Sequence, residues 1–570
     1  MRNIKVIAPL IVMIILALLG IQNEAIILDE AETLCIGKNV AQYGYPVAWN
    51  GEYLNTTING NDYNEELIHV RYPWFQYYLV AFVYLFANNN VLVYKLFFIL
   101  VGVASAYWLY KSAYSFTQDK LSSEISLWLY SISIGVISMI RTIRYYAPSL
   151  LLVNIILYSY NEVIRKKSKK NLIMFIVASV LLFNTFHIFF VCTMLGILIL
   201  YFFYDRKKIA LRYVIIVASC ISIMIIIPAL YFIYFSFVIS NDTFSTNNNS
   251  VIKNMTIALS LYNNYFIPIF LIVIIAFSLW VVNMIFLKKS FSIRDKEKRV
   301  FFLSISLAII NVLVVAILIS YANGYELGYR YLLAGIPMMF VSVGILFRRV
   351  FLYDQIAAIV MVVVMTFSNV FNMAPIWVGD KITEGKLEEY YTGLAQLKEP
   401  YSLARQFCNN YLHPKPKMSI AIKNFLKRYA KDSDLVVSDL LFRDMIYFEC
   451  GLVAYSNIDF DGTVSNLSRD NARSPVFYPD YQGVSVKVED ISWIVVTPDI
   501  IELGYLPYQS FVDEHFERIN IVGAYYYHDF PELNSRLYKE NLQKLDIQIY
   551  RNKDLTEPIS KNILTYDELQ

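Results

Sequence analysis

Residues 1–373 consist of long apolar runs separated by short polar segments. An α-helix needs about 20 apolar residues to cross the hydrocarbon core of a membrane. The pattern predicts eleven membrane-spanning helices, at Val6–Ile21, Val91–Tyr110, Ser122–Ile140, Tyr145–Ile164, Leu172–Phe186, Ile188–Tyr204, Tyr213–Ile239, Phe266–Leu287, Val300–Tyr321, Leu332–Phe347 and Gln355–Phe371. This part of the chain is therefore predicted to be a polytopic α-helical membrane domain.

One further apolar segment, Pro73–Ala87, is only 15 residues long. As a helix it would measure about 22 Å, which is short for a span. We interpret it as an interfacial helix with both ends on the outer side. The competing interpretation makes it a true span and merges the two runs between Leu172 and Tyr204 into one.

Residues 374–570 show a different pattern, in which short apolar runs alternate with helical segments. A helix is predicted at Ile420–Tyr429, and strands at Asp434–Ser438, Ile491–Pro498, Ile519–Val522 and Leu545–Tyr550. Strands that alternate with helices are typical of an α/β domain, here with a small and mostly parallel sheet.

Composition and charge support this division into two domains. The chain is 57% hydrophobic and 17% charged, whereas soluble proteins average about 45–50% and about 25%. A disordered chain and a typical soluble enzyme are excluded. Residues 1–373 hold 28 Lys+Arg and 17 Asp+Glu, and residues 374–570 hold 21 and 29. The acidic balance of the second domain argues against an anionic acceptor bound there, and no nucleic-acid partner is predicted.

Basic clusters indicate how the chain is oriented, because cytoplasmic loops carry an excess of Lys and Arg. The clusters are Arg2/Lys5, Arg165–Lys170, Asp205–Lys208, Lys288–Arg299 and Arg348/Arg349. With these in the cytoplasm, the chain is a multi-pass protein of the cytoplasmic membrane with an extracytoplasmic C-terminal domain. The outer side then includes a first loop of residues 22–72, and we look for function on that side.

Two adjacent carboxylates, Asp29 and Glu30, follow the first predicted span. At the membrane surface such groups are costly unless they are solvated, paired or functional. The competing interpretation is the start of a solvated helix with Asp29 as its N-cap.

Three arginines, Arg71, Arg144 and Arg330, come from three different outer loops. Any one of them could simply reach toward lipid headgroups. Together, near a carboxylate pair, they favour a ligand that carries a phosphate at headgroup depth. His69 is a further candidate hydrogen-bond donor to a sugar or a phosphate.

The order of these motifs over about residues 1–350 resembles the GT-C membrane glycosyltransferases, in particular the protein O-mannosyltransferase and aminoarabinose-transferase-like relatives. The resemblance rests on an N-terminal anchor followed by Asp29-Glu30, Gly44-Tyr45-Pro46, His69 to Trp74 with Tyr77-Tyr78, Arg144-Tyr145, and Arg330-Tyr331 with Pro337.

The resemblance implies an inverting transfer of a sugar from a polyprenyl-phosphate donor, held among membrane lipids, to an extracytoplasmic protein, lipid or glycan. Asp29 would be the general base, and Glu30 would hold Asp29 or orient the acceptor. Donor phosphate would bind to the three arginines. The expected substrate-binding residues are His69, Tyr145 and Tyr331.

Two positions depart from the family pattern. Thr142 and Ile143 stand where many relatives have an acidic residue near the arginine of the second outer loop, and Tyr72 replaces the first of two prolines. The missing carboxylate could have bound a metal, so a divalent metal is possible but has no support here, and no cofactor is predicted.

Two other function classes compete with an enzyme. A transporter or flippase for a lipid-linked saccharide, with an accessory outer domain, is expected to place ionisable or helix-breaking residues at mid-span. Most of the predicted spans are uniformly apolar, which favours the enzyme. A receptor or assembly scaffold would leave Asp29 and Arg71 replaceable without loss of function.

Overall fold

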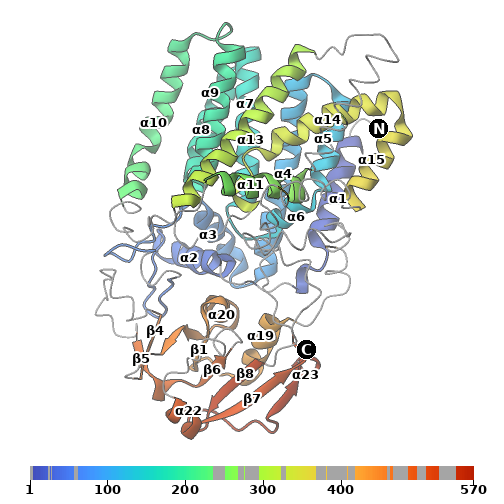
Figure 1. Cartoon of the computed structure of the whole chain (residues 1–570). Helices are drawn as coiled ribbons and strands as arrows, with labels where there is room; N and C mark the ends of the chain where they lie inside the picture. The colour runs from blue at the N-terminus through green and yellow to red at the C-terminus, as the bar shows by residue number, and fades with distance from the viewer. Residues whose placement is uncertain are drawn as a thin grey trace.

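A computed structural model describes residues 4–23, 26, 29–56, 62–234, 251–267, 275, 294–321, 329–367, 381, 407, 417–458, 462–466, 485–496, 509–524 and 547–569. Long helices form a bundle at one end of the molecule, and a sheet domain that carries the C-terminus lies at the other (Figure 1). Two shorter helices lie between them. The helices of residues 1–373 are α1 (Ile4–Leu18), α2 (Asp29–Tyr43), α3 (Phe75–Ala87), α4 (Val91–Thr117), α5 (Lys120–Ser131), α6 (Ile134–Arg141), α7 (Tyr146–Lys166), α8 (Lys169–Thr185), α9 (His187–Leu200), α10 (Leu211–Tyr234), α11 (Val251–Leu261), α13 (Asp295–Tyr321), α14 (Ile336–Tyr353) and α15 (Gln355–Phe367).

Six helices within the described residues are long and apolar enough to cross a membrane, or seven if α5 and α6, which meet at 61°, form one span. The helices α1 and α15 are apolar but shorter. Most of the predicted span Phe266–Leu287 lies outside the described residues. A multi-pass membrane protein is supported, whereas the count of eleven spans stays a prediction.

The runs between Leu172 and Tyr204 form two helices, α8 and α9, separated by Phe186. The competing interpretation, which merged these runs into one span, is therefore wrong in that respect. The loop between α9 and α10, with its basic cluster, lies at the end of the bundle opposite the sheet domain (Figure 1). This separation agrees with the charge pattern; which compartment each end faces stays a prediction.

The short helices α2 and α3 lie side by side at the end of the bundle that faces the sheet domain (Figure 1). Their backbones come close at Gly37, where a Cβ atom would lie 2.2 Å from Cγ1 of Val80. Helix α3 is the apolar segment for which we expect an interfacial position; where it lies relative to the membrane stays a prediction.

From the close contact at Gly37 we predict that a larger side chain at this position destabilises the protein. Gly37→Val is expected to destabilise the protein by about 1–3 kcal/mol, because the added methyl groups force α2 and α3 apart. The thermal midpoint of the detergent-solubilised protein measures this. Gln42→Val on the exposed side of the same helix is the matched control, and equal midpoints for the two variants would contradict the proposed contact.

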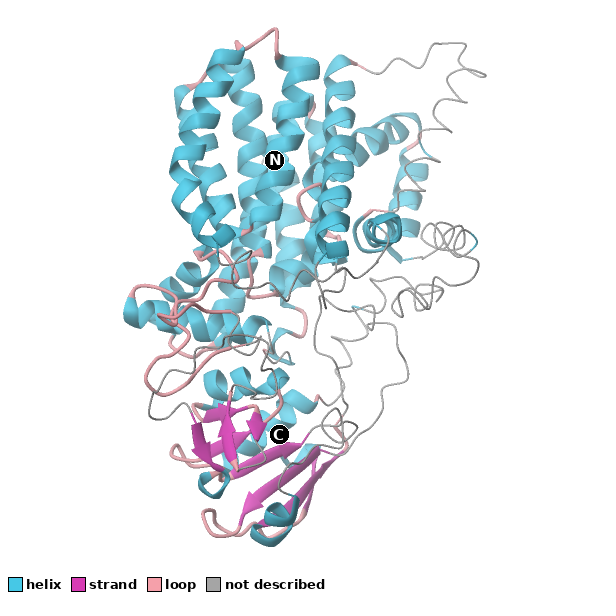
Figure 2. Cartoon of the chain, turned by 60° about the vertical axis from the view of Figure 1, so that its left-hand side comes forward, coloured by secondary structure: helices cyan, strands magenta, loops and turns pink. Residues whose placement is uncertain are grey.

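The C-terminal domain contains a six-stranded sheet in the order β2-β1-β6-β8-β7-β9. Figure 2 draws the strands of this domain as magenta arrows near the C-terminus. Its strands are β1 (Leu435–Val437), β2 (Val453–Tyr455), β6 (Trp493–Val496), β7 (Phe516–Val522), β8 (Ile547–Asn552) and β9 (Ile563–Thr565). A smaller antiparallel sheet contains β3 (Asn457–Ile458), β4 (Thr463–Ser465) and β5 (Ser485–Lys487). The helices are α19 (Met418–Tyr429), α20 (Leu440–Met445), α22 (Gln509–His515) and α23 (Tyr566–Leu569).

The four predicted strands correspond to β1, β6, β7 and β8, and the predicted helix to α19. The prediction of a mostly parallel sheet is confirmed, because five of the six strands run in the same direction. One strand departs from it. Strand β8 runs antiparallel to both of its neighbours, β6 and β7, and this makes the sheet mixed. A short buried strand has the same apolar pattern in either direction, so the pattern could not reveal the direction of β8.

The C-terminal domain docks on the first loop through polar and aromatic contacts. The ring of Tyr53 stacks on Tyr447 with centroids 4.0 Å apart, and its hydroxyl donates a hydrogen bond to Asp444. Arg443 pairs with Asp444, and both side chains are fully buried. Arg443 also donates from Nη2 to the carbonyl oxygen of Thr56 at 2.6 Å. These contacts tie the sheet domain to the segment that carries Asp29.

Candidate active site

Asp29 is the first residue of α2, and both of its carboxylate oxygens contact arginines. Oδ1 lies 2.9 Å from Nη2 of Arg144, and Oδ2 lies 2.9 Å from Nη1 of Arg330. Arg144 comes from the loop before α7, and Arg330 from a short 3-10 helix, η6 (Tyr329–Leu332). The fold therefore brings together three segments that are far apart in the sequence.

The charge state of Asp29 follows from these contacts. Burial by itself would raise the pKa of the carboxyl group, but the guanidinium groups of Arg144, Arg330 and Arg71 outweigh it and hold the pKa below its ordinary value. Asp29 is therefore an anion. An N-cap would direct a carboxylate oxygen to backbone N–H groups, whereas here the oxygens bind side-chain cations.

Arg144 is the most buried of the three arginines, with only 1% of its side chain exposed. Besides Asp29 it contacts Glu32, with Nη1 3.1 Å from Oε2. Its guanidinium group lies over the ring of Tyr72 at 4.8 Å, and that of Arg71 lies 5.0 Å from the same ring. Arg144 therefore points inward to carboxylates and does not extend toward lipid headgroups.

Glu30 makes a different contact from its chain neighbour Asp29. It is buried, and Oε1 accepts a hydrogen bond from the backbone N–H of Ile143 at 2.8 Å. Glu30 thus holds the loop that presents Arg144, which suits a positioning residue. This contact leads us to place it outside the group that would touch an acceptor.

Aromatic rings lie on one side of the arginines. Tyr145 is buried and stacks on Phe186 with centroids 4.2 Å apart. Phe186 also stacks on Tyr331 at 6.2 Å, and Arg330 lies 5.0 Å over the Tyr331 ring. Tyr331 is partly exposed and Tyr145 is not, so a ligand would meet Tyr331 first.

His69 lies in a different environment from the predicted one. It is fully buried, and Nε2 lies 3.0 Å from the hydroxyl oxygen of Tyr77. Burial, helped by Arg71 and Arg144, lowers the pKa of His69 to about 3, so the ring is neutral. Without exposed surface the ring cannot touch a sugar or a phosphate in this arrangement, and the predicted contact to substrate is corrected accordingly.

Two buried acids that sequence reasoning left out of the site, Glu32 and Asp62, lie next to His69. Burial raises the pKa of Glu32 to about 7; Asp29 and Asp62 add to this increase, and Arg144 and Arg71 offset part of it. Glu32 follows Asp29 by three residues on one helix, and this i, i+3 spacing could have indicated that the two are neighbours. Asp62 lies in a loop with no such pattern.

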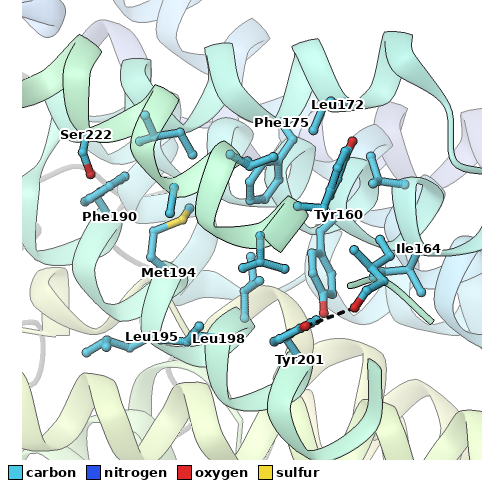
Figure 3. Close-up of a pocket in the computed structure, with 18 residues that line it drawn as sticks. Tyr160, Ile164, Leu172, Phe175, Phe190, Met194, Leu195, Leu198, Tyr201 and Ser222 are labelled. Atoms are coloured by element: carbon cyan, nitrogen blue, oxygen red, sulfur yellow. Dashed lines mark hydrogen bonds between the residues drawn. The ribbon is translucent and has the colours of Figure 1, made fainter. Parts of the chain in front are cut away.

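An apolar pocket of about 270 Å³ lies between α7, α8, α9 and α10 and is separate from this site. Phe175, Phe190 and Met194 are among its lining side chains (Figure 3). Tyr160, which also lines it, follows the first residue of α7 by 14 positions. At 1.5 Å per residue this places Tyr160 about 21 Å along the helix from its first residue, Tyr146, which lies two positions after Arg144.

Comparison with known proteins gives structural matches only. No protein-family model and no curated protein matches the chain. The crystal structure of ArnT from Cupriavidus metallidurans in the apo state matches with a TM-score of 0.56 and 12% identity, over 98% of this chain and 99% of that chain. The structure of ArnT bound to undecaprenyl phosphate matches with a TM-score of 0.54 and 11% identity, over the same shares. The GT-C fold expected from the sequence is confirmed; the activity is argued below.

Proposed function

We propose that this protein is a glycosyltransferase that moves a sugar from a polyprenyl-phosphate donor to an acceptor. The observation that carries the proposal is the pairing of both Asp29 oxygens with Arg144 and Arg330, at the end of an apolar helical bundle. Guanidinium groups are well suited to phosphate because they offer paired N–H donors. ArnT, which has the same fold, was solved with undecaprenyl phosphate, and this supports the same class of donor here.

The proposed reaction uses the carboxylate and the arginines in different roles. An oxygen of the acceptor attacks the anomeric carbon of the sugar, and Asp29 takes the proton that this oxygen loses. The bond between the anomeric carbon and the phosphate oxygen breaks, and polyprenyl phosphate leaves as an anion. Attack opposite the leaving group inverts the anomeric configuration. Arg71, Arg144 and Arg330 stabilise the charge that develops on the phosphate.

Donor binding would also prepare Asp29 to act as a base. Asp29 and Arg330 are each 16% exposed, so a phosphate can reach this pair, whereas Arg144 is buried. A phosphate on Arg330 would compete with Asp29 for the guanidinium group. Since that cation lowers the pKa of Asp29, its loss raises the pKa and makes the carboxylate a stronger proton acceptor.

The experiment that tests the proposed function uses the full chain in proteoliposomes with a polyprenyl-phosphate donor carrying a labelled sugar. We expect release of polyprenyl phosphate, with the labelled sugar attached to an added acceptor fraction or set free by transfer to water. Movement of intact donor between leaflets without cleavage would favour a transporter and contradict the proposal. Empty liposomes and the Asp29→Asn variant are the controls.

A further inference from the structure

The apolar pocket between α7, α8, α9 and α10 lies beside two basic loops, at the end of the bundle opposite the candidate active site. Ile164 and Leu172 line the pocket and flank the loop between α7 and α8. Tyr201, Ile209 and Tyr213 line it as well and flank the loop between α9 and α10. The fold therefore brings the two loops together around one end of the pocket.

The pocket has apolar walls and a fixed polar end. Aromatic, aliphatic and thioether side chains make up most of its lining (Figure 3). Tyr160 donates a hydrogen bond to Oδ2 of Asp205, and Tyr201 donates one to the carbonyl oxygen of Ile209, both at 3.0 Å. Asp205 is fully buried and also pairs with Arg299 at 2.6 Å. These bonds hold the loop end of the pocket in place, and its walls suit a hydrocarbon chain.

The pocket lies where lipid can reach it. Helix α10 stands at the edge of the bundle (Figure 1), and only Ile221 and Phe232 of its side chains are buried. An empty space between helices loses dispersion contacts, and a lipid chain from this edge can restore them. Because lipid tails are as apolar as leucine, however, filling the space gives little preference for one lipid over another.

The charges beside the pocket supply such a preference. The two loops carry nine basic residues. Glu162 pairs with Arg165 and Lys166, and Asp205 pairs with Lys208. Within the described part of the chain, the other six are exposed and make no ion pair; they are Lys167, Lys169, Lys170, Arg206, Lys207 and Arg212.

We propose that the pocket and these six cations bind an anionic phospholipid from the leaflet at this end of the bundle. One acyl chain lies in the pocket, and the phosphate headgroup lies among the cations. Basic residues beside a pocket between membrane helices recognise anionic headgroups, at about fivefold in the binding constant for each cation. Membrane orientation by itself accounts for basic loops, but it does not account for an apolar pocket between them.

The tail of a polyprenyl-phosphate donor is the competing occupant, and the geometry argues against it. The donor phosphate would lie at Asp29 and Arg330, whereas Tyr160 in the pocket is about 21 Å along α7 from the first residue of that helix. A tail that extended into the pocket would bring no charge with it. The six cations would then have no anionic partner from this ligand, whereas a phospholipid accounts for the pocket and the charges together.

The test measures lipid binding to the full-length, delipidated protein in detergent by native mass spectrometry. The probes are phosphatidylglycerol and phosphatidylcholine with identical acyl chains. We expect one tightly bound phosphatidylglycerol per chain, with an affinity about tenfold or more above that of phosphatidylcholine. Equal affinity for the two lipids would overturn the proposal. Displacement of phosphatidylglycerol by polyprenyl phosphate would also overturn it, because the pocket would then belong to the donor.

One pair of variants tests the pocket itself. Ala218 lines it, and Ala218→Trp should weaken phosphatidylglycerol binding about tenfold or more, because the ring takes the space of the acyl chain. Ile216→Trp is the matched control, since Ile216 is an exposed residue of the same helix outside the lining. Equal binding by these two variants, both folded, contradicts the assignment of the acyl chain to the pocket.

A second set of variants tests the cations without changing the pocket. Lys169→Gln and Arg212→Gln should each weaken phosphatidylglycerol binding about fivefold and leave phosphatidylcholine binding unchanged. Lys120→Gln is the control, because Lys120 is an exposed lysine at the start of α5, at the same end of the bundle. If the double variant keeps the wild-type preference, the headgroup does not lie among these cations and the proposal fails. Since no sugar transfer is measured, the result is independent of the proposed function.

Discussion

Replacing Asp29 with asparagine is expected to lower the rate of sugar transfer by about 10²–10⁴-fold, the contribution typical of a general base. Asparagine has nearly the same shape but cannot take the proton that the acceptor loses. Arg144 keeps its contact with Glu32 in this variant, so the fold should persist. The measurement is the initial rate of label transfer in proteoliposomes at equal amounts of inserted protein.

Glu52→Gln is the matched control for this variant. Glu52 lies in the same loop, and its side chain is exposed, so loss of its charge should leave the transfer rate within about twofold, as is usual for surface changes of up to about 0.5 kcal/mol. Wild-type turnover by Asp29→Asn would rule out Asp29 as the base. In that case the arginines would still be candidates for binding phosphate.

Arg144→Met is expected to destabilise the protein by about 3–5 kcal/mol, because removing one partner of a buried ion pair leaves the other charge unpaired. Here two carboxylates, Asp29 and Glu32, would lose their buried partner at once. We expect a lower thermal midpoint, faster proteolysis of the first loop and no detectable sugar transfer. Size-exclusion chromatography of the heated, detergent-solubilised protein measures the midpoint.

Arg330→Met separates phosphate binding from folding. Arg330 is 16% exposed and pairs with Asp29, so water can solvate the Asp29 carboxylate in part when the guanidinium group is removed. We expect a thermal midpoint close to that of the wild type and a donor KM that is about tenfold or more higher, as for loss of a charge-assisted hydrogen bond of about 1.5–3 kcal/mol.

If Arg144→Met has the same thermal midpoint as the wild type, the buried network does not stabilise the fold as described.

The helical bundle could be predicted from the sequence because lipid offers no hydrogen-bond partners to the backbone. Each segment in the hydrocarbon core must satisfy its own hydrogen bonds, so a long apolar run becomes a helix. The runs Tyr145–Ile164 and Val300–Tyr321 accordingly appear as α7 and α13. The bend between α5 and α6 was not predicted, since the apolar run Ser122–Ile140 continues through it.

In the candidate site, the type of side chain led to residues that the fold brings together, but it did not predict how deeply each of them is buried. Charged residues next to a membrane are rare enough to be noticed, and this led to Asp29, Arg144 and Arg330, which the structure brings into contact. His69 was selected as a candidate hydrogen-bond donor to a sugar or a phosphate, but it is buried beside Tyr77. Burial depends on packing from other segments, and a single loop sequence does not contain that information.

Local and distant interactions thus account for different parts of this protein. Apolar length and charge distribution are local properties, and they were enough to predict the two domains, most of the helices and the arginines that meet Asp29. The direction of β8 and the grouping of Glu32, Asp62 and His69 depend on contacts between segments far apart in the chain or joined by irregular loops. Only the folded chain brings those atoms within a few ångströms, where electrostatic interactions and desolvation change their chemistry.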